Sequence, residues 1–237
     1  MNYKITADST CDLSPELLEQ YGLGLTPLYV QLGEKTYRDG VDIFPDDIYA
    51  HVANGGDLAT TAAVNLADYV RLFSDLSRKY DFVIHICISS DFSCCYQNAS
   101  LAAAEYPNVY IVDSRNLSTG HGLVVLEAER CAREGMEPQE IVSYLQVLTE
   151  RVDASFILSR LEYMKKGGRC SSVAVLGATS RAALRAARGL VHEALLGEES
   201  LLGRGEHEFL AAVAADKRFI FVHGWETSFK LSPIPLP

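Results

Sequence analysis

Short apolar runs alternate with longer segments of helical period along the first two-thirds of the chain. Residues 3–7, 27–32, 82–88 and 109–112 are rich in β-branched and aromatic side chains, and the segments between them repeat apolar residues every three or four positions. The run over 82–88 is almost unbroken, which is typical of a strand covered on both faces. This alternation predicts an α/β fold with a mainly parallel sheet and flanking helices.

Polar residues and glycines mark where several of these helices begin and end. Ser14, followed by a proline, predicts an N-cap, and Gly22 predicts the end of the same helix. Asn65 predicts a second N-cap, ahead of a strongly amphipathic segment. Further helices are expected over residues 94–106, 122–135 and 138–148.

The pattern changes after about residue 156, and we expect two domains. Residues 1–154 form the predicted N-terminal α/β domain, and residues 155–237 form a smaller, mixed α/β domain. The carboxyl-terminal part is atypical, because residues 179–189 are rich in Ala and Arg. In the second domain we expect strands over 156–158 and 219–222, helices over 161–166 and 179–196, and a break at 167–168.

Composition excludes some classes of partner. The formal net charge is −10, and no Lys/Arg run reverses it locally, which argues against nucleic-acid binding. No apolar run approaches the roughly twenty residues that span a bilayer. The chain also opens without the basic and apolar stretches of a signal peptide. We therefore expect a cytoplasmic protein with no integral membrane segment.

Cysteine spacing gives no sign of a disulfide framework or a zinc site. No CxxC pair occurs, and several cysteines lie in apolar segments. Reduced and mostly buried thiols are the preferred interpretation. The cysteines are Cys11, Cys87, Cys94, Cys95, Cys131 and Cys170.

Local motifs for several common kinds of catalysis are absent. The sequence holds no GxSxG, GxxxxGK[ST], HExxH or GxGxxG motif. His85, inside an apolar strand, is interpreted as a hydrogen-bonded core histidine, whereas His121, between two glycines, is expected to be more open. Six aspartates are interpreted as helix caps and turn residues rather than magnesium ligands. They are Asp8, Asp12, Asp39, Asp42, Asp46 and Asp47.

Small hydroxyl side chains gather where the predicted strands end. Thr60 and Thr61 form one pair, and Ser89, Ser90 and Ser93 follow the buried strand over 82–88. Ligands of open α/β sheets bind outside the carboxyl ends of the strands. The hydroxyl of Ser93 comes directly before a predicted helix, whose free N–H groups and positive dipole end attract anions. The sequence therefore predicts a pocket for a carboxylate or phosphate.

A series of motifs over about residues 3–177 resembles the DegV family of bacterial fatty-acid-binding proteins. In chain order, the segments 8–13, 27–42, 60–64, 88–99, 112–122 and 161–169 resemble the family's DSxxDL, PL…YxDGxD, TSQPS, ISSxLSGTYQSA, VDSxxxSxGxG and LxYLKKGGR elements. The ordered set is far more specific than any single element.

The resemblance implies a two-domain lipid carrier that is not itself catalytic and needs no cofactor. Such a protein buries one long-chain fatty acid in a tunnel and presents its carboxylate to a separate fatty acid kinase, which makes the acyl phosphate. Carried over by position, Thr61 and Ser93 would bind the carboxylate. The supporting residues would be Thr60, Ser89, Cys94, Ser114, Ser118, Gly120 and His121.

The chain departs from the family pattern in three places. Cys94 and Cys95 replace Gly-Thr after Ser93, and residues 62–64 replace the Gln-Pro-Ser of the other loop. After Gly177 the family's Pro-containing strand and final GPG motif are not found. We therefore expect a shortened second domain, and the family's carboxylate contact from that end has no counterpart to carry over.

Two other classes of function stay open at this point. The first is a hydrolase or phosphotransferase acting on a small anionic metabolite, with Ser93 assisted by His121 or Asp113. The second is a degenerate domain that serves only in interactions.

Overall fold

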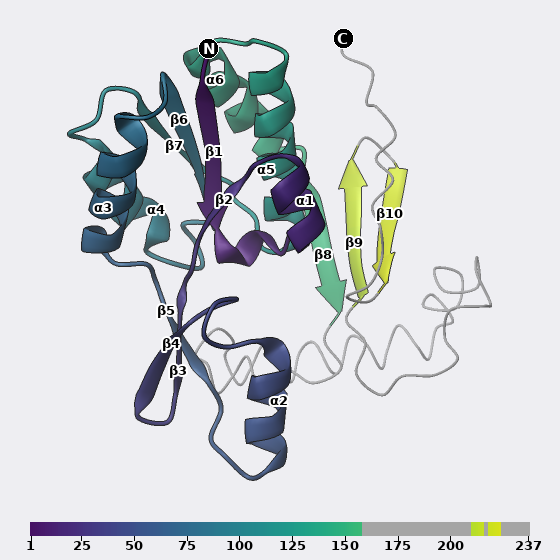
Figure 1. The fold of residues 1–237 in the computed structure, drawn as a ribbon. Helices are drawn as coiled ribbons and strands as arrows, with labels where there is room; N and C mark the ends of the chain where they lie inside the picture. Colours follow the sequence, from purple (N-terminus) through teal and green to yellow (C-terminus); the bar gives the residue numbers. More distant parts are fainter. Residues whose placement is uncertain (158–209, 216–217, 224–237) are drawn as a thin grey trace. The chain divides into compact units, whose positions relative to one another are not determined.

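A computed structural model describes residues 1–157, 210–215 and 218–223 (Figure 1). Two compact units divide the chain: Met1–Ser155 with Ala212–Ile220, and the remaining residues. The predicted domain limits stay predictions, because most of the second domain lies outside the described residues. The helices expected over 161–166 and 179–196 and the break at 167–168 also lie outside them.

A four-stranded parallel sheet forms the centre of the first unit. Its strands are β1 (Tyr3–Asp8), β2 (Gly24–Thr26), β6 (Phe82–Cys87) and β7 (Val109–Asp113), in the order β2-β1-β6-β7. The register places Ala7 beside Ile86 and Cys87 beside Asp113. The carboxyl ends of β1, β6 and β7 therefore open at one edge of the sheet.

Helices cover both faces of this sheet (Figure 1). On one face, Val83 and Cys87 pack with Tyr69 and Phe73 of the third helix and with Ala99 of the fourth. The opposite face packs against the first, fifth and sixth helices. The helices are α1 (Pro15–Gln20), α2 (Pro45–Ala53), α3 (Leu66–Ser77), α4 (Cys95–Ala103), α5 (Thr119–Arg133) and α6 (Pro138–Thr149), and η1 (Ser9–Cys11) is a short 3-10 turn.

Two predicted caps and the predicted buried strand are confirmed. Ser14 Oγ accepts a hydrogen bond from Leu17 N at 3.4 Å, and Asn65 Oδ1 accepts one from Asp68 N at 2.9 Å. Every residue of β6 is buried, because helices cover both faces of the central strand. The strand predicted over 27–32 is confirmed over Tyr29–Leu32, whereas the short strand β2 that precedes it was not predicted.

A small antiparallel sheet branches from the chain between β2 and α3. It contains β3 (Tyr29–Leu32), β4 (Lys35–Arg38) and β5 (Thr60–Ala62), in the order β4-β3-β5. Gly33 takes a φ of 62° in the two-residue turn between β3 and β4, where residues with a Cβ are disfavoured. No pattern in the sequence predicted this sheet.

A third sheet involves the end of the described chain. Its strands are β8 (Asp153–Ile157), β9 (Leu210–Ala215) and β10 (Arg218–His223), in the order β10-β9-β8. The strands predicted near 156–158 and 219–222 correspond to β8 and β10. None of the helices described here is long and apolar enough to cross a bilayer.

Candidate functional site

The candidate site lies at the carboxyl edge of β1 and β6. The chain runs from β1 to β2 on one side and later enters β6 on the other, so the strand order changes direction between β1 and β6. Such a switch point leaves a crevice between the two outgoing loops, and it is where α/β sheets bind ligands. The loops that leave these two strands carry Ser9 and Thr10, and Ser89 to Ser93.

Ser89 organises the loop that follows β6. Its backbone N–H donates to Asn116 O at 3.0 Å, and its carbonyl accepts from Phe92 N and Ser93 N at 3.0 and 3.2 Å. The Ser89 hydroxyl accepts from Asp91 N at 3.2 Å. Ser89 is buried, so its hydroxyl folds the loop and is not available to solvent.

Ser93 stands at the start of α4, as the sequence predicts. Its partly buried hydroxyl accepts from Cys95 N at 3.3 Å and donates to Cys95 Sγ at 3.1 Å. Cys94 is the exposed N-cap residue of α4, and its side chain makes no capping bond. The free N–H groups of the first helical turn lie next in the chain. An anion beside Ser93 would meet both the hydroxyl and this positive helix end.

Thr60 and Thr61 lie on β5, at one edge of the small sheet. They pair with Gln31 and Val30 of β3, and both are exposed. Successive side chains of a strand point to opposite faces, so Thr60 and Thr61 cannot both face the same ligand. This alternation is compatible with one threonine binding a ligand and the other supporting its strand.

Three further predicted residues lie around the turn between β7 and α5. Buried Ser114 donates its hydroxyl to Asn116 O at 3.0 Å and accepts from Asn116 N at 3.2 Å. Ser118, with a φ of 53°, donates its N–H to Thr10 O at 3.0 Å. A Cβ at Gly120 would lie 2.3 Å from Asn116 Oδ1, so glycine permits close packing there. Asn116 thus joins this turn to the Ser89 loop.

His121 is the clearest correction to the sequence analysis. It is fully buried, although its flanking glycines predicted an open position. Its Nε2 lies 3.1 Å from Ile86 O, which makes Nε2 the protonated nitrogen. Burial lowers the pKa of His121 to about 4, so the ring is neutral near pH 7. Within the described residues no hydrogen bond joins His121 to Ser93, so the geometry does not favour this pair as a catalytic dyad.

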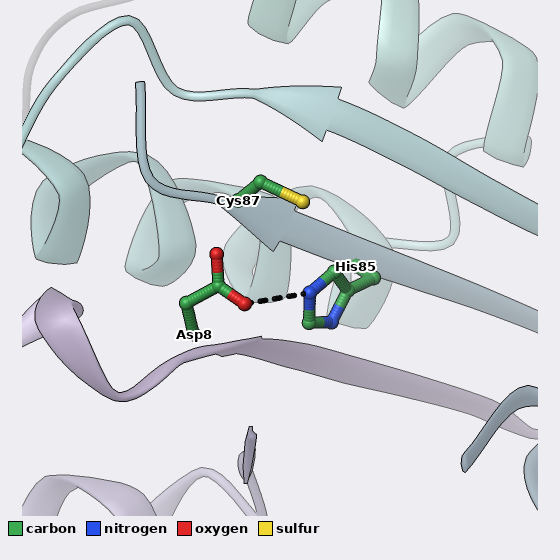
Figure 2. A group of neighbouring side chains, drawn as sticks. All are labelled: Asp8, His85 and Cys87. Carbon is green, nitrogen blue, oxygen red and sulfur yellow. Dashed lines mark hydrogen bonds and ion pairs between the residues drawn. The ribbon is translucent and has the colours of Figure 1, made fainter. Parts of the chain in front are cut away.

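Asp8 forms a buried polar network at the end of β1 (Figure 2). Its Oδ1 accepts from the Tyr69 hydroxyl at 2.6 Å and lies 3.2 Å from His85 Nε2, and its Oδ2 accepts from Ile88 N at 2.9 Å. Thr6 Oγ1 lies 2.9 Å from His85 Nδ1. A proton on Nε2 lets His85 donate to Asp8, and the Thr6 hydroxyl can either donate to Nδ1 or accept from it. His85 is therefore the hydrogen-bonded core histidine that the sequence predicts.

The cap interpretation of Asp8 is wrong, because its side chain does not cap the turn that follows. Burial alone would raise the pKa of Asp8, but the hydrogen bond and charge of His85, with the hydrogen bond of Tyr69, lower it overall. An aspartate at the end of a strand and a histidine inside a neighbouring apolar strand were visible in the sequence. Their pairing, and the role of Tyr69, were not.

A possible metal-binding arrangement involves the same network. One ligand atom each from Asp8, His85 and Cys87 lies within 4.8 Å of the others (Figure 2). Both carboxylate oxygens of Asp8 already accept hydrogen bonds, and burial raises the pKa of Cys87 well above its ordinary value. Metals bind the thiolate, so this environment disfavours a metal site. The network instead anchors Ile88, the residue directly before the Ser89 loop.

Ser9 and Asp39 connect the end of β1 to the small sheet. Ser9 Oγ donates to Asp39 Oδ2 at 2.6 Å and accepts from Leu28 N at 3.2 Å. Asp39 therefore has a structural partner distant in sequence, while Asp47 accepts from Phe44 N at 2.9 Å as a predicted cap residue does. Several residues of the sequence motifs thus position the loops through hydrogen bonds within the protein.

Comparisons with known proteins agree with the resemblance seen in the motifs. A family model described as "Uncharacterised protein, DegV family" matches residues 2–180. A DegV domain-containing protein of Caldanaerobacter subterraneus is 34% identical over 169 residues, 70% of this chain and 60% of the relative. Protein DegV of Bacillus subtilis is 31% identical over 175 residues, 73% of this chain and 62% of the relative. The chain spans about three-fifths of the length of these relatives.

Solved structures share the fold. A DegV family protein from Thermus thermophilus, described by its fatty acid binding, has a TM-score of 0.69 and 28% identity, over 94% of this chain and 71% of that one. A stearic acid-binding protein from Eubacterium ventriosum has a TM-score of 0.65 and 26% identity, over 94% and 71% of the two chains. With most of its length matched by the family model, this chain belongs to the DegV family.

Proposed function

We propose that this protein binds a long-chain fatty acid, with the carboxylate held by Thr61 and Ser93, and presents it to a fatty acid kinase without catalysing a reaction itself. The similarity to the Thermus thermophilus fatty-acid-binding protein, over 94% of this chain, is the observation that carries the proposal. The position of Ser93 at the start of α4, beside the switch point of the sheet, supports it.

Neutral hydroxyls suit the head group of a carrier. Burial of a sixteen-carbon tail contributes on the order of 10 kcal/mol before association losses, at about 0.8 kcal/mol per methylene. The tail then supplies most of the affinity, and the hydroxyls set the orientation of the carboxylate. A nearby arginine would hold a more highly charged acyl phosphate more tightly and slow its release.

Lipid binding is tested on the purified full chain by native mass spectrometry. We expect fatty acid from the expression host to co-purify, and delipidated protein to take up added palmitate or oleate. Thr61→Val and Ser93→Ala each remove one hydroxyl bond to a charged group, which corresponds to about a tenfold or greater loss of affinity. Uniformly empty protein that also takes up neither lipid would refute the proposal.

Presentation to a kinase requires a separate experiment. A bacterial fatty acid kinase with ATP is given palmitate alone, or palmitate bound to this protein, and acyl phosphate is measured. We expect formation only with the loaded protein, and none from the protein and ATP without kinase. Turnover by the protein alone would instead favour the hydrolase or phosphotransferase.

A further inference from the structure

A side-chain hydrogen bond joins the two segments that carry the candidate carboxylate ligands. Asn98 Nδ2, in α4, donates to Val64 O at 2.8 Å. Asn98 follows Ser93 by five residues, and Val64 follows Thr61 by three. The bond therefore connects the start of α4 to the segment between β5 and α3.

Both ends of this bond are held by their surroundings. Val64 is 1% exposed and belongs to the same core cluster as Cys95 and Ala99, the neighbours of Asn98 on α4. The next residue, Asn65, caps α3 through Asp68 N. The bonded carbonyl is thus fixed between a helix cap and a buried side chain.

Cys95 adds a second contact on the same side of α4. Cys95 and Asn98 are three residues apart, a spacing that places both on one face of a helix. Burial raises the pKa of Cys95, while its contacts with the Ser93 hydroxyl and the Val64 backbone act in the opposite direction. Ser93 Oγ lies 3.1 Å from the Cys95 sulfur. Cys95 therefore contacts both the Val64 peptide and Ser93. Asn98 adds a second hydrogen bond from α4 to the same Val64 peptide.

We propose that Asn98 is a positioning residue for carboxylate recognition, because its bond to Val64 sets the register between the Thr61 segment and Ser93. The inference rests on the proposed fatty-acid binding. Two hydroxyls bind one carboxylate only when both lie within about 3 Å of its oxygens, so a small shift of either segment removes a bond. Loss of the Asn98 donor leaves the Val64 carbonyl without this bond and frees the segment to shift.

The test separates head-group recognition from tail binding. Affinities for hexadecanoate and 1-hexadecanol, both delivered from cyclodextrin to the delipidated full chain, are measured for each variant. Asn98→Ala removes the donor, and Asn98→Asp keeps the side-chain shape but replaces the donor with an acceptor. We expect both to weaken hexadecanoate about tenfold while hexadecanol changes less than about twofold. Asn98→Gln, which retains the amide donor, is expected to recover part of the loss.

Asn108→Ala is the matched control. Asn108 is also a partly buried asparagine that donates to backbone carbonyls, those of Ser77 at 2.9 Å and Tyr80 at 3.0 Å, but these lie at and just after the carboxyl end of α3. We expect it to alter thermal stability without changing the ratio of the two affinities. Circular dichroism establishes that each variant is folded. If Asn98→Ala does not fold, Asn98→Asp tests the same bond, because aspartate keeps the side-chain shape of asparagine.

The outcomes distinguish this inference from the proposed function. Wild-type protein that binds neither compound would remove the fatty-acid proposal, and the inference with it. Wild-type protein that binds hexadecanoate, with an unchanged affinity ratio in both Asn98→Ala and Asn98→Asp, would overturn the inference alone. An equal loss for the acid and the alcohol would show a purely structural role.

Discussion

The hydrogen bond from Tyr69 to Asp8 gives a sharp test of how the β1 and β6 ends are held together. Tyr69→Phe removes only a hydroxyl, because the ring keeps its stacking on Phe73 at 5.7 Å and its edge contact with His85 at 5.2 Å between centroids. The lost bond is 2.6 Å long and has an ionised acceptor. Bonds to charged groups contribute about 1.5–3 kcal/mol, so we expect the free energy of unfolding to fall by about that amount.

Urea denaturation followed by circular dichroism at pH 7.5 measures this loss. Tyr29→Phe is the control, since the Tyr29 hydroxyl also bonds to an aspartate, Asp68, but at the partly buried surface. We expect less than about 1 kcal/mol for the control. Equal losses in the two variants, or a loss below about 0.5 kcal/mol in Tyr69→Phe, would refute the assignment of Asp8 as a buried anchor.

The pH dependence of the same variant follows from the lowered pKa of Asp8. Because the folded pKa lies below the ordinary 3.8, the stabilisation is fully present above that value and is lost as the pH falls through the folded pKa. The difference between wild type and Tyr69→Phe should therefore be constant from pH 8 to pH 5 and shrink only below about pH 4. A difference that changes between pH 8 and pH 5 would contradict an ionised Asp8.

Three further predictions concern burial elsewhere in the first unit. Burial lowers the pKa of His121 from 6.5 to about 4, so as the pH falls the unfolded chain takes up a proton at this residue before the folded chain does. The free energy of unfolding should therefore fall by up to about 3 kcal/mol between pH 6.5 and 4. In urea denaturation at a series of pH values, His121→Gln should reduce this pH dependence. Thiol labelling at pH 8 with peptide mapping should modify exposed Cys94 well before buried Cys87, and equal rates would contradict the fold. Gly122→Ala should lower the free energy of unfolding by about 1–3 kcal/mol, because the new Cβ would lie 2.6 Å from the Cys11 carbonyl oxygen. This clash should outweigh the better helix propensity of alanine. A higher urea midpoint for the variant would show that the contact relaxes easily.

Local chemistry explains why much of the first domain was predictable. The caps at Ser14 and Asn65 depend on side chains that bond only three residues away, so their sequence pattern is sufficient. The buried strand over 82–88 is visible because a strand covered on both faces needs apolar residues at nearly every position. The position of Ser93 between this strand and the start of α4 follows from where the strand ends and where the next helix begins.

Long-range pairing explains what was missed. Asp8 looked like a cap because aspartates near turns usually bond locally, yet its partners Tyr69, His85 and Ile88 lie 61 to 80 residues away. His121 looked open because glycines flank it, but those glycines allow α5 to pack closely, as the 2.6 Å approach of a Gly122 Cβ to Cys11 indicates.

The sequence by itself determined β1, β6, β7 and the helices that flank them, two helix caps, the hydroxyl-rich strand exits and the family. Only the tertiary structure decided the strand order β2-β1-β6-β7, the small antiparallel sheet that carries Thr61, and the buried network around Asp8. The physical reason is distance along the chain. Caps and periodicity are set by neighbours within a few residues, whereas strand order and buried polar pairs are set by packing between segments that the sequence pattern does not connect.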